Sequence, residues 1–143
     1  MPRPVKVLFV CVGNSCRSQM AEALARHSTS DVIEASSAGI APLGRIAEAT
    51  QAVLEERGVS MDGQFSKALR PDDSKAAEVI VNMTGLPGTA VFVGSKAKVE
   101  DWAIEDPYGE DLETYRRICD EIEERVADLA VRLRQQQEKS NKK

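Results

Sequence analysis

Short apolar runs rich in β-branched residues alternate along this chain with segments in which apolar positions recur every three or four residues. The first pattern predicts buried strands, and the second predicts amphipathic helices. We expect strands over residues 5–10, 32–36, 79–83 and 90–93, and helices over residues 20–27 and 46–57 and at the carboxyl end. This alternation predicts an α/β fold, in which helices cover both faces of a parallel sheet.

The final helix is expected to be long, because a single apolar stripe continues through it. Its positions are Leu112, Tyr115, Cys119, Ile122, Val126, Leu129 and Leu133. Such a stripe marks the face that a helix buries against a core. Residues 134–143 are mostly polar, and we expect this tail to fray. Because the chain shows no repeat or linker, residues 1–143 are predicted to form one domain.

Charge and composition argue against several classes of function. The 143 residues carry a formal net charge of −4, which does not suit a broad nucleic-acid-binding surface. No apolar run approaches the roughly eighteen residues of a membrane span, and residues 1–4 lack a signal-peptide core. The three cysteines fit a reducing compartment better than a disulfide framework. We therefore expect a cytoplasmic protein that binds neither nucleic acid nor membranes.

The most informative segment directly follows the first strand and reads Cys11-Val12-Gly13-Asn14-Ser15-Cys16-Arg17-Ser18. A turn between a strand and a helix start leaves several backbone N–H groups without partners, and these groups can surround an oxyanion. The helix dipole and the Arg17 guanidinium would favour the thiolate form of Cys11. Gly13 permits a positive φ or a close approach to a ligand, and Asn14 tolerates the left-handed region. We therefore predict that Cys11 is a nucleophile and not an ordinary buried cysteine.

A proton donor for this chemistry is expected in the downstream loop around Asp106. Pro107 biases Asp106 toward an extended conformation, and Gly109 permits a tight turn, so the carboxylate is predicted to lie before the final helix. General acid assistance makes the expulsion of an alkoxide or phenoxide from a phosphate ester much easier. In isolation Asp106 would be read as a helix cap, but together with Cys11 it suggests a general acid.

Three motifs resemble the low-molecular-weight protein tyrosine phosphatase superfamily, which also contains the thioredoxin-coupled arsenate reductases. They are CVGNSCRSQMAE at residues 11–22, Ser37-Ala38-Gly39 and Asp106-Pro107-Tyr108. Their order and spacing extend the resemblance over residues 5–133. The resemblance implies a three-layer α/β/α domain with a four-stranded parallel sheet in the order 2-1-3-4.

The resemblance also implies roles for individual residues. Cys11 is the expected nucleophile, Arg17 the expected clamp on two phosphate oxygens, and Asp106 the expected general acid. Ser18 is expected to hydrogen-bond the thiolate. Substrate-binding positions are expected at Val12, Gly13, Asn14, Ser15, Cys16, Ser18 and Tyr108.

Supporting contacts are implied in the same way. Asn14 is expected to hold the loop in shape with help from Ser37. Neither a metal ion nor a cofactor is implied. The chain between residues 83 and 91 is shorter than in the family, and Gly85, Pro87 and Gly88 disfavour a helix there, so one cleft wall is expected to be reduced.

The resemblance implies a cysteine-dependent phosphomonoester hydrolase of the tyrosine phosphatase type, acting through a phosphocysteine on a phosphorylated protein or a small aryl phosphate. Tyr108 resembles the aromatic wall of the phosphatases, whereas Ser15 and Gln19 resemble the arsenate reductases. Residues 82–88 contain no cysteine for the relay of the thioredoxin-coupled reductases. This absence disfavours the thioredoxin-coupled mechanism. An arsenate reductase that uses Cys11 with an external thiol, a small thiol or thioredoxin, needs no such relay in its own chain and stays open as the alternative. A phosphate-binding module without turnover would need neither Cys11 nor Asp106.

The other two cysteines receive different interpretations. Cys119 falls on the apolar stripe of the final helix and is read as a core residue. Cys16 lies close to Cys11 in the loop. Two roles stay open for it: a reversible disulfide partner of Cys11, or a small side chain packed under the start of the helix.

Overall fold

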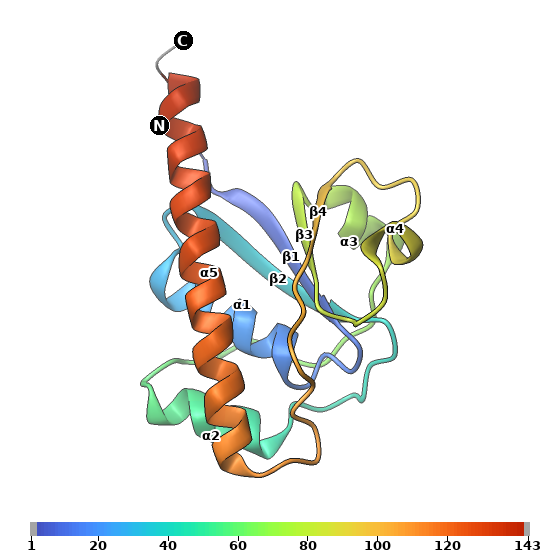
Figure 1. The fold of residues 1–143 in the computed structure, drawn as a ribbon, viewed down its shortest axis with the longest axis vertical. Coiled ribbons are helices and arrows are strands. Elements are labelled where there is room, and N and C mark those ends of the chain that lie inside the picture. Colours follow the sequence, from blue (N-terminus) through green and yellow to red (C-terminus); the bar gives the residue numbers. More distant parts are fainter. Residues whose placement is uncertain (1–2, 142–143) are drawn as a thin grey trace.

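The computed structural model describes residues 3–141 and shows alternating strands and helices around one sheet (Figure 1). The strands are β1 (Val5–Cys11), β2 (Ile33–Gly39), β3 (Val79–Asn82) and β4 (Lys98–Asp101). The helices are α1 (Arg17–Ser28), α2 (Glu48–Glu56), α3 (Pro71–Ala76), α4 (Gly88–Val91) and α5 (Leu112–Asn141). The strands are parallel and lie in the order β2-β1-β3-β4, which confirms the predicted topology.

Alternate residues of the central strand β1 face two different apolar layers. Val7, Phe9 and Cys11 belong to the larger core, which also contains buried residues of α1, α2 and α5. Leu8 and Val10 point the other way, into a smaller cluster with Ile80 and Phe92. This two-residue period is the expected geometry of a strand that is buried on both faces. The sheet is therefore the middle of three layers.

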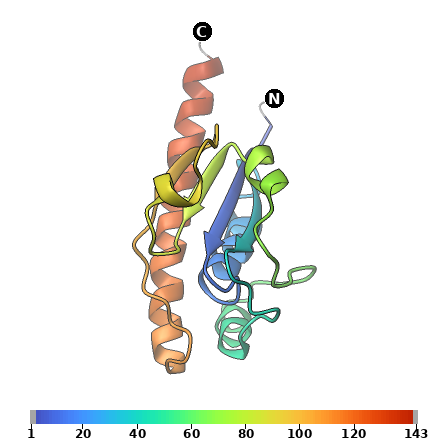
Figure 2. The same ribbon diagram turned by 90° about the vertical axis from the view of Figure 1, so that its right-hand side faces the viewer.

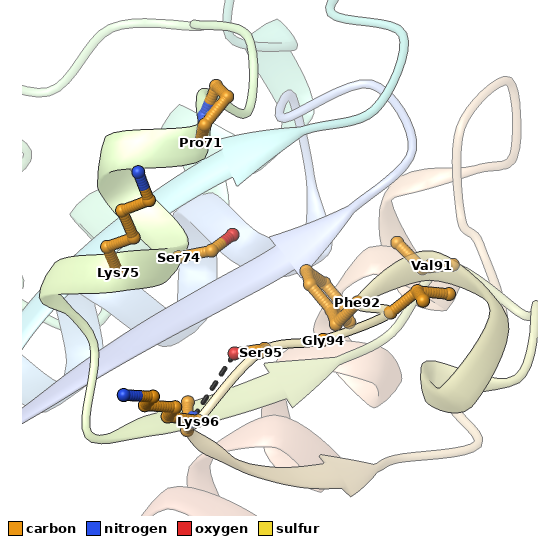
Figure 3. Close-up of a pocket in the computed structure, with 10 residues that line it drawn as sticks. Pro71, Ser74, Lys75, Val91, Phe92, Gly94, Ser95 and Lys96 are labelled. Carbon is orange, nitrogen blue, oxygen red and sulfur yellow. Dashed lines mark hydrogen bonds between the residues drawn. The ribbon is translucent and has the colours of Figure 1, made fainter.

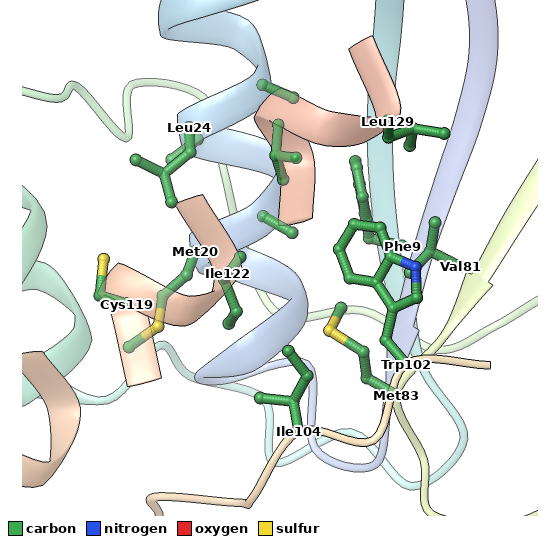
Figure 4. Packing of buried hydrophobic residues seen from close by; sticks show 14 of the residues in the cluster. Phe9, Met20, Leu24, Val81, Met83, Trp102, Ile104, Cys119, Ile122 and Leu129 are labelled. Carbon is green, nitrogen blue, oxygen red and sulfur yellow. The ribbon is translucent and has the colours of Figure 1, made fainter. Parts of the chain in front are cut away.

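The larger core is built where α5 crosses the sheet (Figure 4). Six of the seven predicted stripe positions, from Tyr115 to Leu133, are buried, whereas Leu112 is 36% exposed. Trp102 lies against Phe9, with ring centroids 6.0 Å apart and ring planes inclined by 57°. Pairs of aromatic rings prefer tilted arrangements of this kind. This packing fixes the segment that follows β4 against the sheet, and that segment leads to Asp106.

The fourth strand does not lie where the sequence pattern predicted it. Residues 90–93 fall in and just after the single turn of α4, where Phe92 is buried and Val93 is 80% exposed. The strand is instead β4, whose charged sequence Lys98-Val99-Glu100-Asp101 pairs with β3 at the edge of the sheet. Charged residues are common on edge strands, where they discourage further pairing. An apolar run was therefore mistaken for this strand.

Two further differences concern helices. α3 was not predicted, although Pro71 at its first position and Asp73, which accepts a hydrogen bond from Arg70 N at 2.9 Å, are ordinary helix-start signals. α4 forms in the segment where glycine and proline were expected to prevent a helix. α5 continues through Asn141, so most of the tail expected to fray is helical. Residues 142 and 143 of that tail lie outside the described residues.

α5 projects beyond the rest of the chain in both views (Figures 1 and 2). Near its end, Gln137 Nε2 donates to the carbonyl of Arg3 at 3.1 Å, so this part of α5 lies beside the start of β1. Within residues 3–141, no helix has both the length and the apolar character needed to cross a membrane.

Candidate active site

The loop between β1 and α1 stands at the carboxyl end of the central strand. Its Asn14 has φ +48°, the left-handed conformation that the sequence allowed there. Gly13 has no positive φ; its α-carbon faces Leu43, whose Cγ would lie 3.1 Å from an added Cβ. Gly39, at the end of β2, is more confined, since a Cβ there would lie 2.6 Å from the Val12 carbonyl oxygen. A glycine at position 39 therefore lets β2 approach the loop closely.

Every carbonyl group from Cys11 to Cys16 accepts a hydrogen bond. The donors are Ile40 N to Cys11 at 3.2 Å, Ala41 N to Val12 at 2.9 Å, Leu43 N to Gly13 at 3.0 Å, Gln19 Nε2 to Asn14 at 3.2 Å, Ala47 N to Ser15 at 3.2 Å and Met20 N to Cys16 at 2.9 Å. Ser15 O also accepts from the Thr50 hydroxyl at 2.9 Å. These bonds fix the orientation of the successive peptide planes.

The amide groups of the same loop are free. Within residues 3–141, no acceptor is found for the backbone N–H groups of residues 13–18. They stand at the N-terminus of α1, where the helix dipole adds partial positive charge. A loop with occupied carbonyls and free amides is a ready-made oxyanion site.

Cys11 and Ser18 are joined through their side chains at the floor of this loop. The Ser18 hydroxyl oxygen lies 2.9 Å from Cys11 Sγ and accepts a hydrogen bond from Asn14 Nδ2 at 2.7 Å. Either atom of the Cys11–Ser18 pair can be the donor; because Asn14 donates to the hydroxyl oxygen, the Ser18 proton stays available for the sulfur. All three side chains are buried. This arrangement stabilises a thiolate, since a hydrogen bond donated to an ionised group favours that form.

Arg17 is the cation of the site and is only 5% exposed. Its Nη1 donates to the carbonyl oxygens of Met83 and Ile104, the second at 3.0 Å. Nη2 lies 3.6 Å from Asp106 Oδ2, and Nε is buried without a partner in the structure. The two carbonyl contacts hold one side of the guanidinium, so the Nε and Nη2 edge is free to bind an anion bidentately.

Asp106 and Tyr108 complete a cavity of about 200 Å³ over the loop. Its lining comprises Cys11, Val12, Gly13, Ser15, Cys16, Arg17, Ala41, Leu43, Asp106 and Tyr108. Asp106 Oδ1 accepts the Tyr108 backbone N–H at 3.1 Å, which ties the carboxylate to its own turn. Residues 84–90, the shortened segment, do not line this cavity. The residues predicted as nucleophile, clamp and acid, Cys11, Arg17 and Asp106, are therefore brought together in one cavity.

Asn14 is held by residues that the sequence did not indicate. Its Oδ1 accepts hydrogen bonds from Gln19 Nε2 and from Lys67 N, both at 2.9 Å. Ser37, the expected supporting residue, instead donates to Glu22 Oε1 at 2.6 Å, and Lys67 Nζ lies 3.3 Å from its hydroxyl. No hydrogen bond joins Ser37 to Asn14 among the described residues. Ser37 thus contacts the loop indirectly, through the Lys67 segment.

The Lys67 ammonium lies in a partly buried polar cluster. Burial lowers its pKa, and the buried Glu22 carboxylate, 3.8 Å away, opposes that shift. No sequence signal marks Lys67, because its contacts arise from the pairing of Gly39 with Ala68 at the sheet edge. Gln19 was noted only as a residue typical of arsenate reductases, and its contact with Asn14 could not be foreseen.

Cys16 and Cys119 are buried, and both are free thiols. Cys16 Sγ lies 3.4 Å from the Tyr115 hydroxyl of α5, and burial raises the pKa of this thiol. Burial likewise raises the pKa of Cys119 to about 11. Cys119 is a core residue, as predicted. Cys16 directly precedes α1 and also lines the cavity with Cys11, so both roles proposed for it stay open.

A second cavity, of about 500 Å³, lies elsewhere, between α3 and the segment from α4 to β4 (Figure 3). Phe92 and Val91 form its apolar side, and Ser74, Lys75 and Lys96 line it as well. It contains no cysteine, histidine or carboxylate among its lining residues. A cysteine, a carboxylate and a cation meet in the smaller cavity, which we therefore take as the candidate active site.

Comparison with known proteins agrees with this assignment. A family model described as low molecular weight phosphotyrosine protein phosphatase matches residues 6–139. A glutaredoxin arsenate reductase from Synechocystis is 34% identical over 132 residues, covering 90% of this chain and 98% of the relative.

Solved structures give the same result. An arginine phosphatase from Geobacillus stearothermophilus superposes with a TM-score of 0.85 at 31% identity, covering 95% of this chain and 97% of the other. An arsenate reductase in a phosphate-binding state gives a TM-score of 0.80 at 33% identity, covering 90% and 98%. The chain, with Cys11 and Arg17 in the loop between β1 and α1, therefore belongs to the low-molecular-weight phosphotyrosine protein phosphatase family.

Proposed function

We propose that this protein is a cysteine-dependent phosphatase that works through a phosphocysteine intermediate. The observation that carries the proposal is the shared cavity of Cys11, Arg17 and Asp106, with Asp106 Oδ2 3.6 Å from Arg17 Nη2. Hydrolysis of a phosphate ester requires a nucleophile, a clamp for the phosphoryl oxygens and a proton donor for the leaving group. Each of these is supplied by one of the three residues.

In the first step, the Cys11 thiolate attacks phosphorus and the bond to the leaving oxygen breaks. Asp106, in its protonated form, transfers a proton to that oxygen. The free amides of residues 13–18 and the Nε and Nη2 edge of Arg17 bind the equatorial oxygens. Preorganised donors of this kind contribute about 3 kcal/mol each in comparable sites.

In the second step, water attacks the phosphocysteine. Asp106, now ionised, accepts a proton from this water, and inorganic phosphate leaves while the Cys11 thiolate is regenerated. The Ser18 hydroxyl, 2.9 Å from the sulfur, stabilises the thiolate as the leaving group of this step. The substrate-binding roles predicted for Val12, Gly13, Ser15 and Cys16 are supported by their position in the cavity wall.

The positions of the cysteines favour hydrolysis over an intramolecular arsenate reduction. A reductase that forms a disulfide within its own chain needs a second thiol that can reach Cys11. Cys119 is buried among the apolar residues of α5 and does not line the cavity. Cys16 lines the cavity with Cys11, but its sulfur lies against the Tyr115 hydroxyl. Residues 82–88 contain no cysteine.

For the substrate we propose an aryl phosphate, with phosphotyrosine of a protein as its natural form. Tyr108, 48% exposed at the rim of the cavity, offers a flat surface for an aromatic ring. Phosphoarginine is the competing substrate, since the Geobacillus relative is an arginine phosphatase. The hydroxyl of Ser15, buried without a partner, would accept an N–H from a guanidinium. Peptides carrying either group distinguish the two.

The test is steady-state hydrolysis of p-nitrophenyl phosphate, phosphotyrosine peptide and phosphoarginine peptide as a function of pH. We expect Cys11→Ser to abolish turnover and Asp106→Asn to lower kcat by about two to four orders of magnitude. Turnover that survives Cys11→Ser would contradict the mechanism. A parent that binds phosphate but hydrolyses none of these substrates would indicate a binding module.

A second candidate is arsenate reduction with an external thiol, favoured by the 34% identical arsenate reductase. Cys11 would attack arsenate and displace water. An external thiol would then attack the Cys11 sulfur, so that arsenite leaves with the electron pair, and a second thiol would release Cys11 as the outer disulfide forms. Arsenite formation with glutathione or reduced thioredoxin, without phosphatase activity, would support this candidate.

A further inference from the structure

A chain of side-chain hydrogen bonds leads from the partly buried Gln64 to the nucleophile. Gln64 Nε2 donates to Gln19 Oε1 at 2.7 Å, and Gln19 Nε2 donates to Asn14 Oδ1 at 2.9 Å. Asn14 Nδ2 then donates to Ser18, whose hydroxyl lies 2.9 Å from Cys11 Sγ. Gln19 is fully buried. In each of the three amide links, from Gln64 to Gln19, from Gln19 to Asn14 and from Asn14 to Ser18, the donor is the residue farther along the chain of bonds from the sulfur.

The direction of this chain is fixed by backbone atoms, which have unambiguous donors and acceptors. Gln19 Nε2 lies 2.9 Å from the carbonyl oxygen of Phe65 and 3.2 Å from that of Asn14, so the atom at this position must be the nitrogen. The backbone N–H of Lys67 donates to Asn14 Oδ1, so the nitrogen of that amide must face Ser18. Neither carboxamide can be reversed without opposing two like groups.

We propose that Gln19 and Gln64 are positioning residues that direct the Ser18 proton to the Cys11 sulfur. They hold the Asn14 carboxamide so that Ser18 can only accept from it. Without Gln19, Asn14 Oδ1 keeps one donor, Lys67 N, and the carboxamide is freer to turn. Ser18 can then donate to Asn14 instead of to sulfur. The inference rests on the proposed role of Cys11 as a thiolate nucleophile.

Other charged and titratable groups also face Cys11. Arg17 and Cys16 belong to the same loop and helix, Asp106 and Tyr108 face it across the cavity, and Tyr115 of α5 stands behind Cys16. None of them contacts Gln19 or Gln64 through a hydrogen bond in the described chain. Substitution of the glutamines therefore leaves the charges around the sulfur unchanged and tests the hydrogen-bond chain alone.

The experiment measures the rate of Cys11 alkylation by iodoacetamide as a function of pH, which reports the thiolate without requiring turnover. Gln19→Met keeps the side-chain length and removes the donor, and Gln64→Met removes the next link. We expect the pH midpoint of alkylation to rise by about one unit in Gln19→Met, a tenfold loss of thiolate below the midpoint. A smaller rise is expected in Gln64→Met. Gln51→Met, at an exposed site on α2, is the matched control.

Circular dichroism and thermal melting establish that each variant is folded. If folded Gln19→Met and Gln64→Met both keep the parent's midpoint, the inference is wrong. If Gln19→Met does not fold, Gln64→Met alone tests the inference, which is then wrong if the pH midpoint of alkylation equals that of the parent. A parent that lacks phosphatase activity but shows the expected shifts would refute the proposed function and leave the positioning role supported.

Discussion

The sulfur of Cys16 lies 3.4 Å from the hydroxyl oxygen of Tyr115, and both side chains are buried. The contact joins two parts of the chain that are 99 residues apart in sequence. Cys16 immediately precedes α1, and Tyr115 lies in the first turn of α5. The final helix therefore supports the loop between β1 and α1 from behind.

Tyr115→Phe tests this support with minimal change in shape. The variant loses one buried hydrogen bond, and we expect the free energy of unfolding to fall by about 1 kcal/mol. Because Tyr115 does not line the catalytic cavity, kcat for p-nitrophenyl phosphate should stay near the parent value. Urea unfolding and steady-state kinetics measure the two effects. A large loss of kcat with unchanged stability would show that the hydroxyl acts on the chemistry itself.

The three thiols should differ sharply in reactivity. Burial raises the pKa values of Cys16 and Cys119, so both remain protonated at neutral pH and react slowly. Cys11, with a Ser18 donor and unpaired amides around it, should react first. Brief treatment with iodoacetamide at pH 7, followed by peptide mass spectrometry, should find label on Cys11 alone. Equal labelling of Cys16 would contradict the raised pKa of this thiol.

Arg17→Lys should be nearly as harmful as Arg17→Ala. The guanidinium is held by two carbonyl oxygens on Nη1, and its other edge is left for the anion. A lysine ammonium cannot satisfy the carbonyls and present a bidentate edge at the same time. We expect kcat to fall by about two to three orders of magnitude in both variants. Near-normal turnover in Arg17→Lys would rule out the clamp role.

Two glycines near the loop should respond differently to alanine. A methyl group on Gly39 would lie 2.6 Å from the Val12 carbonyl oxygen and 2.9 Å from Asn14 N, both backbone atoms of the loop. We expect Gly39→Ala to cost about 1–3 kcal/mol in stability and to lower kcat/KM. In Gly13→Ala the close contact is with the half-exposed Leu43 side chain, which can move, so the loss of stability should be smaller. Thermal melting of the two variants provides the comparison.

Glu100 should give the protein a measurable loss of stability in acid. Its carboxylate accepts hydrogen bonds from Arg132 at 2.8 and 3.0 Å and from Trp102 Nε1 at 3.2 Å, and the pair joins β4 to α5. The Arg132 hydrogen bonds lower the pKa of Glu100 in the folded state. The Glu100–Arg132 pair therefore stabilises the fold fully at pH values above the pKa of a glutamate in the unfolded chain, about 4.3. This stabilisation is lost as the pH falls through the lower pKa that Glu100 has in the folded protein.

Glu100→Gln should accordingly be less stable than the parent by about 1 kcal/mol at pH 7, and the difference should shrink below pH ~4. Urea unfolding at several pH values measures it. Asp31→Asn, which breaks the more exposed Asp31–Arg134 pair, serves as the control and should have a smaller effect. If the stability difference between Glu100→Gln and the parent grew in acid, the lowered pKa assigned to Glu100 would be wrong.

Local patterns predicted the parts of this fold that depend on local physics. The strand before Cys11, the left-handed Asn14 and the apolar stripe of α5 are each determined by residues close together in sequence. β4 was misplaced because its charged residues form a strand only through pairing with β3. The position of β4 thus depends on pairing between segments that are distant in the sequence, which the pattern of apolar residues does not reveal.

In the candidate site, too, some residues could be predicted from local sequence patterns and others could not. The loop and Asp106 could be predicted, since a motif and a turn mark them. The hydrogen bonds to Asn14 from Gln19 and Lys67 could not, because they depend on how residues 64–67 pack on the loop. Ser37 was expected to help Asn14 hold the loop, but which groups its hydroxyl reaches, Glu22 and Lys67, could not be read from the sequence for the same reason.

The contact between Gln137 and Arg3 has a practical consequence. Both ends of the described chain lie near the amino end of β1, whereas the catalytic cavity lies at the carboxyl end of this strand. An affinity tag or a fluorescent protein fused to either terminus would thus stand on the opposite side of the molecule. Enzyme immobilised on a surface through such a tag would keep its cavity open to the solution.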